Sequence, residues 1–272
     1  MLGSLVVIYP TPHEGGELVL RHKDREWKIG AKSLTALRST SSLAYVAFYS
    51  DIDHEVLKVT SGRRVTVTYN LYLVNTASDA STVTSNPMCA SNFQITLRNL
   101  LRDPTFLPDG GTLGFGLVHL YPVSSKVVLQ EIVHFLKGED AYVYKACREL
   151  QLKPSLKIIY DDTQTISSNY GIMMDEIVVD PEYNYENNSY RGTLVEKLGG
   201  IPVNIAEGAS VEFSYWISDA DYGGEFINWI SPFSTRNELR DVGIAYGNEI
   251  SMDTVYCSPC IIVRIGPARE RT

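Results

Sequence analysis

Residues 43–73 read LAYVAFYSDIDHEVLKVTSGRRVTVTYNLYL, and this stretch decides the fold class. Its first and last parts are rich in β-branched and aromatic residues, and a polar segment containing glycine separates them, which is the pattern of strands joined by turns. Successive side chains of a strand point to opposite faces, so Arg64, Thr66 and Thr68 share one face of the last part. We therefore predict a strand with one positive, hydroxyl-lined face.

The same short rhythm continues on both sides of this stretch. Runs of strand length alternate with Gly, Pro, Ser and Asp, and helical patterns enter only after the first third of the chain. We predict a mainly β protein of the α+β class. Further strands are expected at 5–8, 17–20, 26–29, 156–160, 172–179, 211–217, 226–230 and 260–265, and helices at 97–101, 127–136 and 140–150.

The composition excludes several classes of protein. With 44% hydrophobic and 21% charged residues, the 272-residue chain can bury a core and is neither disordered nor fibrous. Its 24 basic and 32 acidic residues give a net charge of −8, so nucleic acid is not an expected partner. No apolar run approaches the ~20 residues of a membrane-spanning helix, and the N-terminus lacks a signal-peptide pattern. We expect no membrane partner and an intracellular location, cytoplasmic or nuclear.

Few motifs carry chemistry by themselves. Neither a Ser-His-Asp arrangement nor a GxxxxGK phosphate loop can be identified, which leaves hydrolases and kinases without support. Cys257 and Cys260 have the spacing of half a zinc knuckle or of a redox pair, but a tetrahedral zinc site needs four ligands and the sequence has no second pair of this kind. We expect neither zinc nor redox chemistry there.

The segment from Phe48 to Arg64 is the most informative one. A neutral imidazole at a strand end, here His54, can ligate a divalent metal, and a guanidinium at the start of the next strand, here Arg64, can hold a carboxylate through two hydrogen bonds. Together they suggest a metal and an anionic co-substrate. A histidine near acidic residues is also often a surface or hydrogen-bonded residue, and the pattern leaves both interpretations open.

Two stretches, GSLVVIYPTPHEGGELVLRH (3–22) and AFYSDIDHEVLKVTSGRRVTVTYNLY (47–72), closely resemble the iron(II) and 2-oxoglutarate-dependent dioxygenases of the prolyl 4-hydroxylase type. The similarity is to a group of mostly fungal proteins of unassigned substrate, and it extends through GGTLGFGLVHLYP, LKGEDA and AYGNEI. The resemblance implies a double-stranded β-helix of the jelly-roll or cupin kind. In that family a His-x-Asp pair and a distal histidine hold iron(II), and open positions take 2-oxoglutarate and oxygen.

The resemblance also implies roles for single residues. His54 corresponds to the distal iron ligand, and Arg64 to the basic residue that binds the far carboxylate of 2-oxoglutarate. Arg63 takes the less tightly specified position before it. Thr68, on the same face as Arg64, is expected to support that carboxylate through a hydroxyl hydrogen bond. The expected cofactors are therefore Fe(II) and 2-oxoglutarate.

One departure from the family pattern concerns the His-x-Asp pair. In the family this pair precedes the GSLVV-like strand, and the sequence begins at Met1, where that strand begins. We therefore expect a partial, N-terminally truncated β-helix without the first two iron ligands. His22-Lys23-Asp24 fits the string, but the 29 residues between Asp24 and His54 leave room for few strands, so a charged hairpin tip is expected there.

Three regions and two functions follow from this comparison. Residues 1–75 are expected to be the C-terminal part of the oxygenase domain, 76–92 a polar linker or excursion, and 93–272 a mixed β and helix region. The chain is either an oxygenase that hydroxylates an unknown protein or small-molecule substrate, or an inactive β-helix scaffold that serves as a binding or interaction module. Missing strands would leave an exposed sheet edge, from which we expect self-association.

Overall fold

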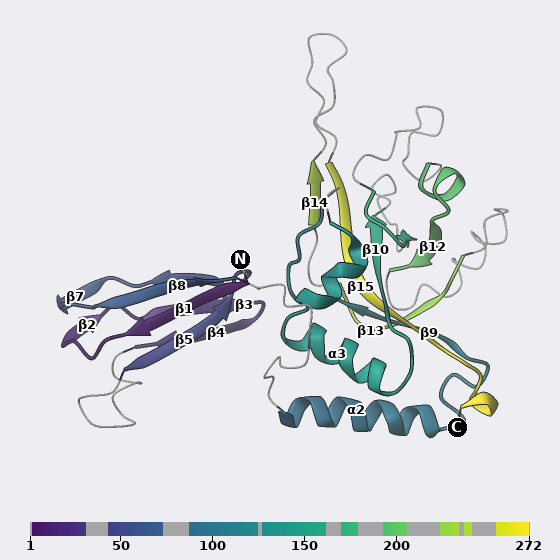
Figure 1. Ribbon diagram of the computed structural model, residues 1–272, viewed down its shortest axis with the longest axis horizontal. Helices are drawn as coiled ribbons and strands as arrows, with labels where there is room; N and C mark the ends of the chain where they lie inside the picture. The colour runs from purple at the N-terminus through teal and green to yellow at the C-terminus, as the bar shows by residue number, and fades with distance from the viewer. Residues whose placement is uncertain are drawn as a thin grey trace, which may run out of the picture. The chain divides into compact units, whose positions relative to one another are not determined.

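The computed structural model of the chain describes residues 2–30, 43–72, 87–124, 127–161, 170–178, 193–205, 224–233, 237–240 and 254–271. They belong to two compact units, Met1–Asp79 and Ala80–Thr272, each of which is described by itself (Figure 1). Taken together, the described elements are mainly strands, as the sequence pattern predicts.

The first unit consists of short strands on a single folded ribbon. Strand β8 pairs with β1, β7 with β2 and β6 with β3, always antiparallel, so residues 53–71 run back along residues 3–22. Strands β5 and β4 pair with the other sides of β1 and β3. The strands are β1 (Gly3–Ile8), β2 (His13–Gly15), β3 (Leu18–His22), β4 (Arg25–Ile29), β5 (Ala44–Tyr49), β6 (Asp53–Val56), β7 (Val59–Gly62) and β8 (Thr66–Leu71).

The ribbon bends at β2 and β7, where glycines permit it. Gly15, Gly16 and Gly62 have φ of 70°, 69° and 76°, values that favour glycine. The bend divides the ribbon into two three-stranded sheets, β5-β1-β8 and β4-β3-β6, joined by the two-stranded pair β2-β7. The sequence pattern did not reveal β2, β6 or β7.

The two three-stranded sheets face each other. Val6 and Ile8 of β1 are buried on the face that also carries Phe48 of β5, because cross-strand partners share a face. The ring of Phe48 lies against that of His54 in β6, with 4.9 Å between the centroids. We call these two opposed faces the inward faces of the unit. The outward face of β4-β3-β6 is polar, and there Arg21 pairs with Glu26 and Glu55 at 2.7 and 2.5 Å.

The second unit contains one large mixed sheet with helices. The sheet has the strand order β12-β11-β10-β15-β9-β13, and β14 also pairs with β15. The elements are α2 (Pro87–Arg102), β9 (Gly111–Gly116), η1 (Leu129–Phe135), α3 (Gly138–Glu149), β10 (Ser155–Asp161), β11 (Tyr170–Met174), η2 (Thr193–Lys197), β12 (Ile201–Asn204), β13 (Ile227–Ser231), β14 (Asn237–Arg240), β15 (Thr254–Ile265) and η3 (Ala268–Glu270).

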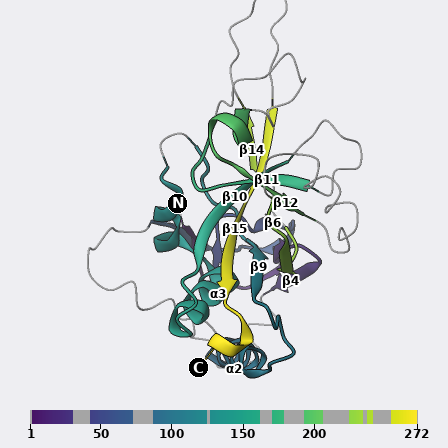
Figure 2. The same ribbon diagram turned by 90° about the vertical axis from the view of Figure 1, so that its right-hand side faces the viewer.

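This sheet curls into a half-barrel (Figure 2). Its end strands β12 and β13 are linked by a bridge between Val203 and Glu225. The Asn204 amide donates to the carbonyl of Ile227 at 2.9 Å and accepts from its N–H at 2.7 Å. The indole of Trp229 donates to the Asn204 carbonyl at 2.7 Å. The bridge, the buried Asn204 amide and the Trp229 indole therefore tie the two ends of the curl together.

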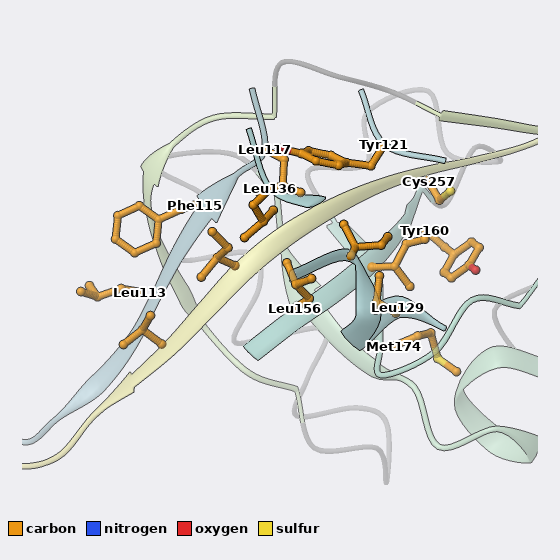
Figure 3. Close-up of a cluster of buried hydrophobic side chains, with 14 of the residues drawn as sticks. Leu113, Phe115, Leu117, Tyr121, Leu129, Leu136, Leu156, Tyr160, Met174 and Cys257 are labelled. Atoms are coloured by element: carbon orange, nitrogen blue, oxygen red, sulfur yellow. The ribbon is translucent and has the colours of Figure 1, made fainter. Parts of the chain in front are cut away.

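Each face of the curled sheet has its own core. Along β15 the odd-numbered Cys257, Ile261 and Val263 belong to the core on the helical side, while Cys260 and Ile262 belong to the other. Figure 3 shows the larger core, which is built from aliphatic and aromatic side chains of the strands, η1 and the loop after β9. The smaller core comprises Ile159, Met173, Val203, Ile227, Trp229, Cys260 and Ile262.

Some expected boundaries need correction. Helix α2 begins at Pro87, so the stretch expected as a linker over 76–92 is helical from Pro87 onward. Proline suits the first turn of a helix, and Phe93, Leu97 and Leu101 then recur at intervals of four and pack on the larger core. The strand expected at 211–217 and the AYGNEI segment lie outside the described residues. Within the described ranges, no helix is long and apolar enough to cross a membrane.

Candidate functional site

Arg64 lies two residues before Thr66, the first residue of β8, and shares the inward face with Thr66 and Thr68, the partners of Ile8 and Val6. The side chain is half-buried, and its Nη1 donates to Thr66 Oγ1 at 3.4 Å. The other face of this strand carries the exposed Val65, Val67 and Tyr69.

The Arg64 side chain passes over Gly16. A Cβ atom at Gly16 would come within 2.8 Å of Arg64 Cδ and of Val59 Cγ2. The glycine therefore leaves room for the guanidinium arm, in addition to permitting the left-handed φ of the bend. Position 16 belongs to the site through the space that it provides.

Arg64 differs from Arg21 and Arg264 in its electrostatics. Partial burial lowers the pKa of its guanidinium, and among the described residues no carboxylate forms an ion pair with it. By contrast, Arg21 is held by Glu26 and Glu55, and Arg264 by Glu225 at 2.8 Å. A half-buried guanidinium without a protein counter-ion is suited to binding an anion from solution, and its planar fork matches a carboxylate.

His54 lies on the inward face of the opposite sheet. It pairs with Leu20 in the β3–β6 ladder, and its Nδ1 is 3.2 Å from the carbonyl oxygen of Ile52. If Nδ1 donates its proton to this carbonyl, the neutral ring keeps a lone pair on Nε2, which is the arrangement of a histidine ready to ligate a metal. The ring is exposed, and its contact with Phe48 limits its orientation.

The His22-Lys23-Asp24 string forms the tip of the β3–β4 hairpin, with Lys23 at a φ of 54°. Lys23 and Asp24 are exposed in the turn. His22 is two residues beyond Leu20, so it lies on the inward face next along from His54. A ring nitrogen of His22 lies within 4.8 Å of a carboxylate oxygen of Asp51. Sequence reasoning missed Asp51, because only folding of the loop after β5 brings it to His22.

Arg63 and His13 make hydrogen bonds with backbone carbonyl groups of the ribbon. Arg63 is exposed, and its N–H donates to the carbonyl of Pro12 at 3.2 Å. His13 contacts the carbonyl of Thr11 through Nδ1 at 2.7 Å. Both residues belong to the bend of the ribbon. The structure therefore groups Arg64, Thr66 and Thr68 on one inward face and His54 on the opposite one.

In the second unit, two motifs of the family resemblance meet at Asp140. This residue of α3 accepts hydrogen bonds from the N–H groups of Val118 and His119 at 2.8 and 3.1 Å and from the Tyr121 hydroxyl at 2.8 Å. Burial raises the pKa of Asp140 against the opposing effect of these donors. GGTLGFGLVHLYP and LKGEDA are thus linked through a buried carboxylate, which is a structural role.

The Cys257 and Cys260 thiols point to opposite faces of β15, because the two residues are three positions apart on a strand. Both are buried. Burial raises the pKa of the Cys260 thiol, and it raises that of Cys147 to about 12. In this arrangement the two thiols do not face a common metal or each other.

Comparisons of the chain with protein-family models, with curated proteins and with solved structures find no match. Interpretation of the site therefore depends on its own geometry and on the residues that carry the family resemblance. Among the described residues of the first unit, the geometry favours Arg64 as the group to contact a ligand.

Proposed function

We propose that the first unit is part of a double-stranded β-helix of the iron(II) and 2-oxoglutarate-dependent oxygenase type, and that it binds 2-oxoglutarate at Arg64. The folded ribbon supports this proposal, because it stacks β8-β1-β5 on β6-β3-β4 with their inward faces opposed. Such a sandwich of two antiparallel sheets is the architecture of jelly rolls.

The observation that carries the proposal is the state of Arg64. Its guanidinium is partly buried, faces inward and lacks a carboxylate partner among the described residues. The Thr66 and Thr68 hydroxyls on the same face can each donate a hydrogen bond. A distal carboxylate of a dicarboxylic acid would receive two parallel N–H bonds and further hydroxyl bonds there.

The residues fit iron less well than 2-oxoglutarate. Iron sites of this class take two histidines and one carboxylate. His54 supplies one nitrogen, but the one His-x-Asp string of the sequence places its Asp24 in an exposed turn. His22 and Asp51 are donors of the right types in a different order. This donor set does not match the family's, and we derive no step through iron.

An interaction scaffold is the second candidate function. The observation that favours it is the outward face of β5-β1-β8, where Tyr45 and Tyr69 are 74% and 54% exposed. Apolar groups gathered on one exposed face often mark an interface. The two candidates differ in whether 2-oxoglutarate binds.

Calorimetric titration of the full chain with 2-oxoglutarate tests the proposal. We expect binding that Arg64→Lys weakens at least tenfold, because an ammonium lacks the planar two-pronged contact. Gly16→Ala should also weaken it, since the new Cβ displaces the Arg64 arm. Arg63→Lys is the matched control and should bind as the wild type does. Wild-type protein that does not bind at millimolar ligand, or equal binding by Arg64→Lys, would contradict the proposal.

A further inference from the structure

The edge of β8 offers unpaired backbone groups in a defined order. The Tyr9 N–H donates to the Val65 carbonyl at 3.0 Å, and the Leu2 N–H to that of Leu71 at 2.7 Å. The direction of backbone groups alternates along an antiparallel strand, so those of Thr66, Thr68 and Asn70 point away from β1. Among the described residues, no strand pairs with this side of β8.

The charges that usually protect a sheet edge are absent from β8. Edge strands avoid pairing with other chains through charged side chains, proline or bulges. Strand β6 carries Asp53 and Glu55, and β4 carries Arg25, Glu26 and Lys28. The sequence of β8 is TVTYNL, without a charge or a proline, and the same holds for AYVAFY of β5 at the other edge of its sheet. Pairing of two β6 strands would oppose acids, whereas pairing of two β8 strands opposes no like charges.

The outward face beside this edge is apolar. Cross-strand partners place Tyr45, Val7 and Val67 in one row and Ala47, Leu5 and Tyr69 in the next. A second strand added to β8 would extend these rows. Val67 is 37% exposed and Tyr69 is 54% exposed, so both side chains are accessible to a strand added at this edge.

We propose that β8 of one chain pairs antiparallel with β8 of a second copy, in the register that places Thr68 opposite itself. In this register, Thr66, Thr68 and Asn70, whose backbone groups point away from β1, all meet a residue of the same kind on the second strand. Thr66 lies opposite Asn70, and Thr68 lies opposite Thr68. The pairing forms six backbone hydrogen bonds around a two-fold axis. On the apolar face, this register pairs Val67 with Tyr69. On the other face, it pairs the Thr68 hydroxyl with itself and the Thr66 hydroxyl with the Asn70 amide. Such cross-strand pairs are favourable.

The occupant is a second copy because the edge is complementary to itself. In a two-fold dimer, the two strands pair in opposite directions, so each residue meets the one at the mirrored position of the second copy. From Thr66 to Asn70 the order of polar and apolar residues is the same in both directions, so polar residues meet polar ones and apolar residues meet apolar ones. The contact is short, well below the ~1,600 Å² of a standard interface. We therefore expect a weak dimer that dissociates in the micromolar range.

Sedimentation of the full chain over a range of concentrations around ~10 μM tests this pairing. We expect wild type to dimerise and Thr68→Pro to shift the dissociation constant at least tenfold, because proline removes the central N–H from the edge while the ladder to β1 is kept. Val67→Lys should act in the same direction by placing two ammonium groups beside the axis. The matched control is Ala47→Pro on β5. The Ser50 N–H donates to Leu2, so by alternation the Ala47 N–H also points away from β1. This variant should dimerise as the wild type does.

A cross-link tests the register itself. Directly opposed residues of a hydrogen-bonded pair have Cα atoms ~5.5 Å apart, which a disulfide can span. Thr68→Cys should form a covalent dimer on mild oxidation, faster than Tyr69→Cys and faster than the wild type. A wild type that remains monomeric, dimers unaffected by Thr68→Pro and Val67→Lys, or loss of the dimer only in Ala47→Pro would each overturn the proposal. If Thr68→Pro does not fold, Val67→Lys and the cross-link decide.

Discussion

Replacing Asp140 should unfold the second unit more readily than any exposed substitution. The carboxylate is 3% exposed and accepts hydrogen bonds from two backbone N–H groups and a tyrosine hydroxyl. Each buried donor left without a partner costs about 1–3 kcal/mol. The three losses are not independent, because the freed loop can relax, so we expect Asp140→Ala to lower the free energy of unfolding by about 3–5 kcal/mol.

Such a loss is large for a domain whose total stability is about 5–15 kcal/mol. Asp140→Asn should lower the free energy of unfolding less, because the amide carbonyl still accepts hydrogen bonds. Some loss is still expected, because the amide N–H groups face a donor that the carboxylate accepted from. Glu139→Gln, at the exposed neighbouring position of α3, is the control and should change stability by about 0.5 kcal/mol. The assay is urea unfolding followed by circular dichroism at the helix band, since the described α-helices belong to the second unit.

The pH dependence gives an independent check on the sign. The pKa of Asp140 is raised in the folded protein from 3.8, mainly by burial, so the folded state holds this proton more tightly than the unfolded state. Its contribution to stability is complete below 3.8 and is lost as the pH rises through the folded pKa. The advantage of wild type over Asp140→Asn should therefore shrink with rising pH. Equal unfolding midpoints for Asp140→Ala and Glu139→Gln would refute the structural role.

Two further predictions concern iron and the thiols. With Fe(II), oxygen and 2-oxoglutarate, the chain should release no more succinate than the His54→Ala variant, because one histidine cannot replace a set of three ligands. Turnover that requires His54 together with His22 and Asp51 would contradict this prediction and establish another ligand set. Native protein should bind no zinc and should react slowly with a thiol reagent at Cys147, Cys257 and Cys260, because all three are buried. Rapid labelling of these positions, mapped by mass spectrometry, or zinc in stoichiometric amount would count against that arrangement.

The strands that the sequence revealed are those whose apolar residues alternate or cluster. The patterns of GSLVVI and TVTYNL predict β1 and β8 in this way. Strand β6, Asp53–Val56, has no such signal, because its regular conformation depends on pairing with Leu18 and Leu20 of β3. Helix α2 was underestimated for the opposite reason. Its polar beginning resembles a linker, and only packing of Phe93 and Leu97 on a distant strand core gives it an apolar side.

The candidate site was accessible from sequence only where alternation determines it. Arg64, Thr66 and Thr68 share a face by spacing alone, and the structure has them so. Neither the space above Gly16 nor the lack of a described counter-ion for Arg64 can be read from spacing, because both depend on the bend of the ribbon. The approach of Asp51 to His22 cannot be predicted from the sequence either, since twenty-eight residues, including strands β4 and β5, lie between them.

The proposed ligand site and the proposed dimer edge use the same strand in perpendicular directions. The side chains of Thr66 and Thr68 lie on the inward face with Arg64, while their backbone groups point along the sheet, away from β1. A protective charge on the inward side of β8 would interfere with Arg64, because an acid would neutralise the guanidinium and a lysine would compete for its anion. Hydroxyls avoid both effects and leave the edge unprotected. Uncharged residues on the inward side of β8 are thus compatible with a carboxylate-binding Arg64, and they leave the edge open to the proposed self-pairing.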